Sequence, residues 1–191
     1  MRCAQPVVPV RAAPADDAEQ VTQALAGEPL EVELVEAGWA RITTAYGYPG
    51  WVRADAVEEG EGRLEADAEG TPLDVARRYL GAPYLWGGMT DQGIDCSGLV
   101  HMAFRRVGRV VPRDADQQEE AGAPVSEPQP GDLVTYGDGS ADHVAFWLGG
   151  GRILHSTGRD GGIGVVEEDE PAEYRARRRR FVRFSTSAER G

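Results

Sequence analysis

Lysine is absent from this chain of 191 residues, so all 20 of its basic residues are arginines. With 32 acidic residues, the formal net charge is −12. The imbalance is greatest at the start, where residues 1–69 contain 14 acidic residues and 5 arginines. Because an acidic surface repels polyanions, we do not expect nucleic acids or anionic wall polymers as partners.

Cysteine is also scarce, since the chain has only Cys3 and Cys96, far apart in the sequence. Such a pair provides neither a disulfide framework nor the ligand spacing of a cysteine zinc site. The chain has no apolar run of the roughly 18 residues that span a bilayer, so we expect no membrane insertion. The N-terminus lacks the apolar core of a secretory signal. These features predict a cytoplasmic protein, or a secreted one whose signal has been removed.

The most informative segment is Asp-Cys-Ser-Gly-Leu-Val at residues 95–100. Apolar residues recur with helical spacing from Leu99 to Val107, and Gly108 ends the run. Cys96 therefore lies in the first turn of a predicted helix, where unpaired N–H groups and the helix dipole stabilise a thiolate. We expect the pKa of this thiol to fall toward neutral, as in a cysteine nucleophile. The alternative is a small buried apolar side chain.

Upstream, Thr-Pro-Leu-Asp at residues 71–74 has the pattern of a helix start, and this helix is predicted to run to about Leu80. The loop that follows, residues 81–88, reads Gly-Ala-Pro-Tyr-Leu-Trp-Gly-Gly. Its Pro and Gly residues suggest that Tyr84 and Trp86 lie along a cleft rather than in a core.

Downstream, residues 143–148 and 152–156 form two β-rich runs joined by three glycines at 149–151, which predicts a hairpin. In a regular hairpin the start of the first strand lies near the end of the second. The hairpin therefore brings His143 and His155, two of the three histidines, to one end of the sheet. A set of one cysteine and two histidines would explain all three positions at once, whereas each histidine alone could be an ordinary strand residue.

The Pro-Tyr-x-Trp-Gly-Gly loop, the Asp-Cys-Ser-Gly-Leu-Val segment and the His-Val-Ala to His-Ser hairpin resemble NlpC-type cell-wall peptidases. These are papain-like cysteine peptidases that cleave peptidoglycan stem peptides. The resemblance covers roughly residues 71–184. A further family motif, Arg-Asp-Ser, is present here as Arg113-Asp114-Ala115. The alanine implies that one substrate hydrogen bond of the family is missing.

The resemblance implies that Cys96 attacks the scissile carbonyl as a thiolate and that His143 pairs with it and later protonates the leaving amine. His155 would orient His143. The backbone N–H of Cys96 would hold the oxyanion, together with the side-chain oxygen of Tyr84. This chemistry needs no metal or cofactor. The substrate-binding residues expected on the catalytic side are Tyr84, Trp86, Asp95, Ser97 and Asp114.

The first part of the chain has a different pattern. Between residues 7 and 57, short alternating runs at 30–35, 39–42 and 46–52 are separated by glycine turns, which predicts a small barrel. Its Gly-Trp-Ala-Arg-Ile and Gly-Tyr-Pro-Gly-Trp-Val segments resemble bacterial SH3-like domains. The sequence therefore predicts an α+β protein. It comprises an SH3-like β-barrel domain (residues 1–60), an acidic linker (61–70) and an NlpC-type papain-like catalytic domain (71–191).

The predicted function is a cytoplasmic γ-D-glutamyl–diamino acid endopeptidase of murein peptide recycling, which releases L-Ala-γ-D-Glu from meso-diaminopimelate or L-Lys. By resemblance, the SH3-like domain closes one end of the cleft and selects peptides with a free N-terminal L-Ala. We expect Asp114, Glu19 and Tyr48 to bind that ammonium group, with Tyr46 or Glu28 as alternatives for the two barrel residues.

Two other functions remain open. One is a secreted wall hydrolase whose SH3-like domain binds intact peptidoglycan. The other is an amidase or acyltransferase that acts on lipids, against which the order Cys, His, His argues. The preferred diamino acid and the oligomeric state are left open. An arginine run at residues 177–180 is explained at least as well by a solvated strand edge as by a binding patch.

Overall fold

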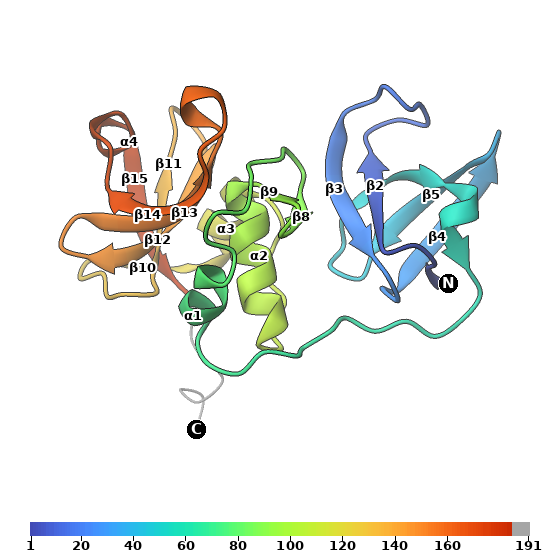
Figure 1. Cartoon of the computed structure of the whole chain (residues 1–191), viewed down its shortest axis with the longest axis horizontal. Helices are drawn as coiled ribbons and strands as arrows, with labels where there is room; N and C mark the ends of the chain where they lie inside the picture. The colour runs from blue at the N-terminus through green and yellow to red at the C-terminus, as the bar shows by residue number, and fades with distance from the viewer. Residues whose placement is uncertain (185–191) are drawn as a thin grey trace.

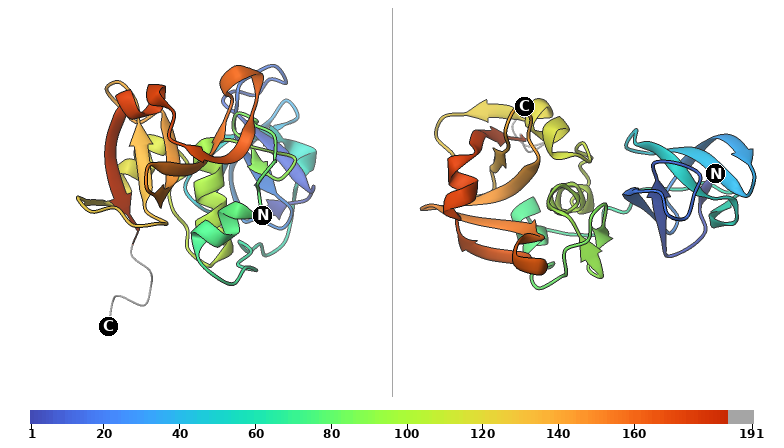
Figure 2. Two further views of the ribbon diagram at one scale, coloured as in Figure 1. Left: turned by 60° about the vertical axis from the view of Figure 1, so that its left-hand side comes forward. Right: turned by 90° about the horizontal axis from the view of Figure 1, so that it is seen from above.

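A computed structural model describes residues 1–184 of the chain, which form two parts joined by an extended segment (Figure 1). The first part is built from strands, and the second combines helices with a large sheet. Helix α2 (Cys96–Arg106) lies between that sheet and the N-terminal part in both Figure 1 and Figure 2. Across residues 1–184, none of the helices has both the length and the apolar character to cross a membrane.

The N-terminal part contains a five-stranded antiparallel sheet in the order β3-β2-β6-β5-β4. Its strands are β2 (Val7–Arg11), β3 (Gln20–Leu25), β4 (Leu30–Glu36), β5 (Trp39–Thr44) and β6 (Pro49–Arg53), followed by a 3₁₀ turn (Ala54–Ala56). A separate ladder pairs β1 (Arg2–Cys3) with β7 (Val57–Glu58). Alternation along the strands buries Val10, Ala24 and Ile42 completely, which forms the core of this part. Since β3 and β4 are the two edges of the recorded sheet, closure into a barrel stays a prediction.

The segment 59–70, which includes the predicted linker 61–70, has no helix or strand. It is nevertheless attached to helix α2. The carboxylate of Asp67 accepts two hydrogen bonds from Arg106, at 2.9 and 2.6 Å, and the N–H of Ala68 donates to the Arg106 carbonyl at 2.9 Å.

The second part contains a six-stranded antiparallel sheet in the order β10-β15-β11-β12-β13-β14. The strands are β10 (Ala123–Val125), β11 (Leu133–Tyr136), β12 (His143–Gly149), β13 (Arg152–Thr157), β14 (Gly164–Asp169) and β15 (Arg178–Arg183), with a 3₁₀ turn at Arg159–Gly161. A small ladder joins β8 (Met89–Thr90) to β9 (Gly93–Ile94). The helices are α1 (Pro72–Arg77), α2, α3 (Ala115–Ala121) and α4 (Ala172–Ala176).

The main core lies between helix α2 and one face of this sheet. Leu99, Ala103 and Phe104 of α2 pack in the same buried cluster as Phe146 and Leu154 of the sheet. The helical spacing that predicted α2 is therefore the pattern of its buried face, and burial of these side chains contributes roughly 1.5–3 kcal/mol for each large one. This packing fixes the start of α2 against the start of β12.

Two local predictions can be compared directly with the structure. The predicted hairpin is confirmed as β12 and β13. The helix start at 71–74 is also confirmed, because Thr71 and Asp74 form a reciprocal capping box. The predicted end of that helix at about Leu80 is wrong, since α1 ends at Arg77. Residues 78–80 continue as tight turns in which each N–H bonds three residues back.

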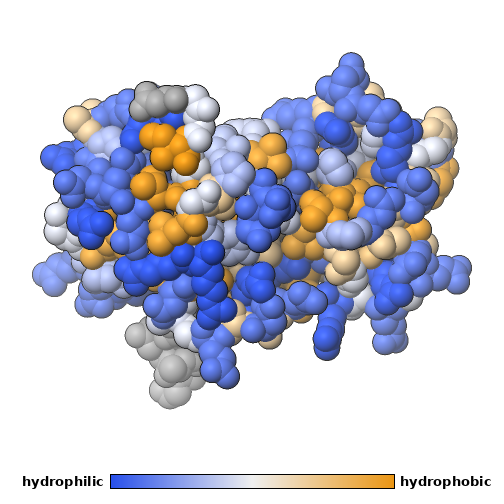
Figure 3. Space-filling view, viewed as in Figure 1, coloured by the Kyte–Doolittle hydropathy of each residue, from blue (hydrophilic) through white to orange (hydrophobic). Residues whose placement is uncertain are grey.

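The arginine run comprises Arg177, which follows helix α4, and the first three residues of strand β15, and its members pair with carboxylates. Arg177 pairs with Asp138 and Asp142, Arg178 with Glu170, and Arg179 and Arg180 with Glu119. These ion pairs support the structural explanation of the run over a binding patch. The face seen in Figure 3 is mainly hydrophilic, with separate hydrophobic patches over both parts.

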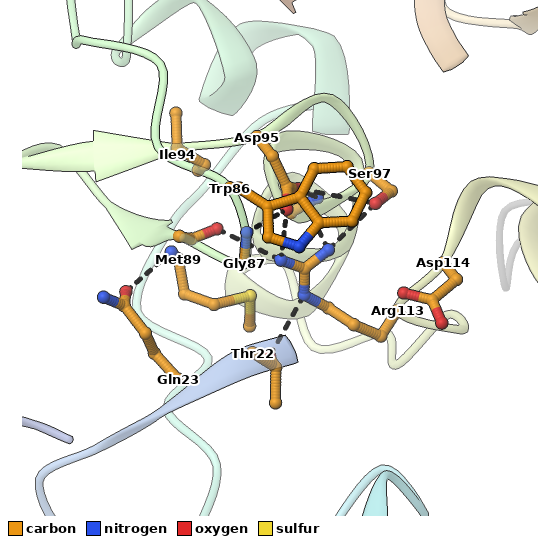
Figure 4. Close-up of polar contacts among 12 residues, drawn as sticks. Thr22, Gln23, Trp86, Gly87, Met89, Ile94, Asp95, Ser97, Arg113 and Asp114 are labelled. Atoms are coloured by element: carbon orange, nitrogen blue, oxygen red, sulfur yellow. Dashed lines mark hydrogen bonds and ion pairs between the residues drawn. The ribbon is translucent and has the colours of Figure 1, made fainter. Parts of the chain in front are cut away.

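Buried polar contacts join the two parts. The side-chain oxygen of Gln23 on β3 accepts a hydrogen bond from the N–H of Met89 at 2.8 Å, and Arg113 donates to Thr22 at 3.1 Å (Figure 4). Because a buried polar group is costly without its partner, these contacts fix how the N-terminal sheet sits on the second part.

A second set of contacts lies deeper in the same interface. Arg105 of α2 approaches Glu28 at 2.5 Å, and both side chains are almost completely buried. Nearby, the ring of Tyr46 packs against His101 at a centroid distance of 4.5 Å. The interface therefore contains a charged pair and an aromatic pair, each with one member from either part.

Candidate active site

Cys96 is the first residue of helix α2, and its neighbours explain how it is placed there. Asp95 caps the helix, with its carboxylate accepting a hydrogen bond from the N–H of Gly98 at 2.6 Å. Gly98 is needed because a Cβ at this position would lie 2.4 Å from the carbonyl oxygen of Gly88. The aromatic loop can therefore pass directly over the first turn of the helix.

The Asp95 carboxylate is held by the buried guanidinium of Arg113 in a two-pronged ion pair, at 3.0 and 2.8 Å. Arg113 also donates to the hydroxyl of Ser97 at 2.9 Å, and Figure 4 shows it at the centre of this network. The second oxygen of Asp95 accepts from the N–H of Gly87 at 2.8 Å. Asp95 and Ser97 thus fix the position of the cysteine as well as lining its cavity.

The electrostatic state of Cys96 differs from the expectation. Burial, with a smaller contribution from the charge of Asp95, raises the pKa of its thiol to about 12. Hydrogen bonds from the backbone N–H groups of Ser97 and Val144 act in the opposite direction but are weaker. The predicted fall of this pKa toward neutral is therefore wrong, because the helix position favours the thiolate less than complete burial disfavours it.

The two histidines of the hairpin meet as the sequence suggested. Nε2 of His143 lies 2.8 Å from Nδ1 of His155, and both side chains are buried. The ring of His143 also stacks on Tyr174 at 4.5 Å. Because Nε2 contacts His155, Nδ1 of His143 is the ring nitrogen left to take a proton, and the N–H of Val144, the next residue, bonds to the Cys96 sulfur. Burial, and then the neighbouring His155, hold the pKa of His143 well below its usual range.

A cavity of about 260 Å³ opens beside Cys96 and receives side chains from both parts of the protein. The predicted site residues that line it are Glu19, Tyr48, Trp86, Asp95, Cys96, Ser97 and Asp114. The other lining residues are Val21, Ala115, Asp116, Ala141 and Asp142. Among the described residues, this wall carries five carboxylates and no basic side chain. Asp95 and Asp142 are paired with arginines outside the wall, which leaves Glu19, Asp114 and Asp116 for a cationic ligand group.

Two of those carboxylates are held by neutral donors across the interface. The indole N–H of Trp86 donates to Glu19 at 2.8 Å, and the hydroxyl of Tyr48 donates to Asp114 at 3.0 Å. Burial raises the pKa of Asp114, although the bond from Tyr48 opposes that shift. Since neither donor is charged, these carboxylates keep their attraction for a cation.

The two alternatives named for the barrel residues do not line this cavity. Tyr46 packs on His101 and bonds to Thr22, and Glu28 pairs with Arg105 inside the interface. Both side chains therefore belong to the contact between the parts, and the structure gives no support to their role in ligand binding at this cavity.

Tyr84 lies on the other side of the histidine. A second cavity, of about 440 Å³, is lined by Tyr84, His143, Thr157, Gly158, Arg159, Glu173, Tyr174 and Arg177. Burial raises the pKa of the Tyr84 phenol, and the charges of Cys96 and Asp95 raise it further. The phenol is therefore a protonated donor close to the cysteine.

Sequence reasoning missed two groups behind the histidines. Nε2 of His155 lies 2.9 Å from Glu168, and Arg159 binds both oxygens of that carboxylate at 2.9 Å. Glu168 stands in the run Val-Glu-Glu-Asp-Glu at 166–170, where no local feature distinguishes it from the other acidic residues. Among residues 1–184, no group of three or more His, Cys, Asp or Glu side chains has the arrangement of a metal site.

Both parts of the chain match known protein families. Residues 81–180 match the NlpC/P60 family, and residues 10–57 match the bacterial dipeptidyl-peptidase SH3 domain. A γ-D-glutamyl-L-lysine dipeptidyl-peptidase from Bacillus subtilis is 35% identical over 130 residues, which are 63% of this chain and 42% of the relative. The peptidoglycan endopeptidase RipB from Mycobacterium tuberculosis is 36% identical over 138 residues, with 62% and 57% covered. The chain thus spans about half the length of the curated relatives it matches.

Solved structures give the same picture of the fold. An NlpC/P60 family protein from Bacillus cereus aligns with 95% of this chain and 62% of its own, with a TM-score of 0.57 and 22% identity. The NlpC/p60 domain of the peptidoglycan hydrolase SagA aligns with 60% of this chain and 97% of its own, with a TM-score of 0.51 and 33% identity. The predicted combination of a papain-like α+β fold with an N-terminal SH3 domain is therefore confirmed.

Proposed function

Since the chain belongs to the NlpC/P60 family and carries a bacterial SH3 domain, we propose that it is a cysteine peptidase that hydrolyses the γ-D-glutamyl–diamino acid bond of murein-derived peptides with a free N-terminal L-Ala. The carboxylate-lined cavity beside Cys96 is the observation that carries this proposal. Peptides of this kind arise when the wall is turned over. We therefore place the reaction in murein peptide recycling.

The chemistry starts from an uncharged pair, because burial raises the pKa of the Cys96 thiol and lowers that of His143. Nδ1 of His143 takes the thiol proton as the sulfur attacks the scissile carbonyl, so charge develops only in the transition state. The oxyanion is bound by the backbone N–H of Cys96, and the protonated phenol of Tyr84 is the second donor.

His143 then returns the proton to the leaving amine of the diamino acid, and a thioester remains on Cys96. A water molecule, deprotonated by the same ring, hydrolyses the thioester and releases L-Ala-γ-D-Glu. Because His143 lines the second cavity, the diamino acid leaves on that side, while the acyl part occupies the cavity beside the cysteine.

The amino end of the peptide is bound in the acidic cavity. Glu19 and Asp114 can accept charge-assisted hydrogen bonds from an ammonium group, each worth roughly 1.5–3 kcal/mol. Since Glu19 and Tyr48 come from the N-terminal part, that part closes the cavity at this end. A substituent on the amine would remove the charge and would meet this wall.

The test is a comparison of L-Ala-γ-D-Glu-meso-diaminopimelate with its N-acetylated form, with products identified by mass spectrometry. We expect acetylation to lower kcat/KM at least about 10²-fold. It removes charge-assisted hydrogen bonds worth roughly 1.5–3 kcal/mol each, and a tenfold change corresponds to roughly 1.4 kcal/mol. The matching pair of L-Lys peptides shows which diamino acid is preferred. Comparable rates on free and acetylated peptides, or efficient release of peptides from intact sacculi, would contradict the proposal and favour a wall hydrolase whose SH3 domain binds peptidoglycan.

A further inference from the structure

The residue behind the two histidines is a carboxylate that the family resemblance did not supply. Glu168 on β14 faces His155 on β13, and the two side chains are 2.9 Å apart. The other ring nitrogen of His155 contacts Nε2 of His143 at 2.8 Å. Three side chains from three adjacent strands therefore form one hydrogen-bonded row that ends near Cys96.

The chemistry of this row fixes where its protons are. A carboxylate can only accept, so Nε2 of His155 must carry the proton that bonds to Glu168. A neutral imidazole has a single N–H, which leaves Nδ1 of His155 as an acceptor. His143 must then donate from Nε2 and keep its Nδ1 lone pair, which is the atom that takes the thiol proton.

We propose that Glu168 is a positioning residue that holds His155, and through it His143, in the tautomer required for deprotonating Cys96. The inference rests on the proposed cysteine chemistry, but not on the identity of the peptide substrate. Without a carboxylate at this position, His155 could carry its proton on Nδ1. It would then force His143 to present an N–H to the thiol instead of a lone pair.

The surroundings of Glu168 keep it charged. Burial acts to raise its pKa, but the hydrogen bonds from Arg159 and His155 outweigh that effect and lower the pKa of Glu168. Arg159 grips both carboxylate oxygens at 2.9 Å and also approaches Glu173 at 3.5 Å. The acceptor opposite His155 is thus an ionised carboxylate whose orientation is fixed by Arg159.

Groups from the neighbouring elements surround His155 and affect its pKa or the position of its proton. Burial lowers the pKa of His155, Glu168 on β14 raises it, and the charge of Arg159 lowers it. His143 on β12 and the ring of Tyr174 on α4, at 5.4 Å, complete the enclosure. Among these described groups Glu168 is therefore the anion, and it also stabilises the imidazolium that His143 becomes during attack.

The strand offers a matched control. Glu167 is the preceding residue of β14 and pairs with Arg77 at 2.7 Å, on the side of the strand away from the histidines. Glu168→Gln and Glu167→Gln each remove one carboxylate charge from the same strand. Only Glu168→Gln alters the hydrogen-bonded row of Glu168, His155 and His143.

The first measurement uses the unmodified protein. In ¹⁵N spectra of its histidine rings, we expect His143 and His155 both to carry the proton on Nε2. A proton on Nδ1 of either ring at neutral pH would overturn the inference, whatever the variants do.

The second measurement is the rate at which iodoacetamide alkylates Cys96. We expect Glu168→Gln to lower this rate and the kcat for peptide cleavage by about 10- to 100-fold, with little change in KM, and Glu168→Asp to recover part of the loss. Glu167→Gln should match the unmodified protein. Equal effects of the two Gln variants would overturn the proposal. Correct tautomers and alkylation without any peptide cleavage would instead refute only the proposed substrate.

Discussion

The hydroxyl of Tyr48, on the N-terminal part, donates a hydrogen bond to Asp114 at the start of helix α3, with 3.0 Å between the two oxygens. This bond crosses the interface at the edge of the cavity that holds Cys96. The acidic end of the cavity is therefore a composite of both parts, and neither part contains it alone.

Asp114→Asn should weaken binding of peptides with a free amine. Loss of one charge-assisted hydrogen bond, roughly 1.5–3 kcal/mol, predicts about a 10- to 100-fold lower kcat/KM. Because the pKa of Asp114 is raised, the same loss should begin, as the pH falls, at a higher pH than for an ordinary aspartate. Steady-state kinetics over a pH series measures both effects.

Two tyrosine variants provide a matched comparison for the role of Asp114. Tyr48→Phe removes the hydroxyl that orients Asp114 and should raise KM, whereas Tyr46→Phe removes one that bonds to Thr22 inside the interface and should leave KM unchanged. Equal KM values for the two variants would show that Asp114 does not depend on its cross-interface bond.

Cys96→Ala should abolish turnover while the fold stays intact. In the unmodified protein, iodoacetamide should label Cys96 before the buried Cys3, because Cys96 lines a cavity and its sulfur contacts the residue next to His143. Since burial raises the pKa of the Cys96 thiol to about 12, the labelling rate should keep rising as the pH increases through the alkaline range. A rate that is already constant below neutral pH would indicate a preformed thiolate and contradict the uncharged pair.

The histidines should differ in the size of their effects. His143→Ala removes the group that moves the proton and should cost about 10³-fold or more in kcat. His155→Ala should cost less, and His155→Asn should recover part of the loss by restoring an acceptor for Nε2 of His143. Purified variants with unchanged circular dichroism provide the comparison, and a larger loss for His155→Ala than for His143→Ala would reverse the assigned roles.

Ala115→Ser should raise kcat/KM. Ala115 lines the cavity at the position where the family motif has serine, and a hydroxyl there could bond to the substrate. One such bond, worth roughly 0.5–1.5 kcal/mol, predicts up to about a tenfold higher kcat/KM. Ala141→Ser adds the same group elsewhere in the cavity wall and is the control, so an equal gain in both variants would argue against a specific bond at position 115.

Local sequence patterns predicted the parts of the site that depend on residues close together in the sequence. The apolar spacing after Cys96 gave helix α2, and the glycine turn gave the hairpin that joins His143 to His155. The pKa of Cys96 could not be predicted in this way, because it depends on burial by segments far apart in the chain. Glu168 was missed for a similar reason, since only strand pairing shows which acidic residue of its run faces the histidine.

The pairing of Glu28 with Arg105 has a consequence for how such proteins can be recombined. Burial raises the pKa of Glu28 while Arg105 opposes the shift, so the charge of Glu28 depends on its partner across the interface. Removing one member of a buried ion pair typically costs about 3–5 kcal/mol, a large fraction of the stability of a small domain. The two parts are therefore not interchangeable modules: a chimera with a foreign SH3 domain must carry a carboxylate at the position of Glu28, or replace Arg105 as well.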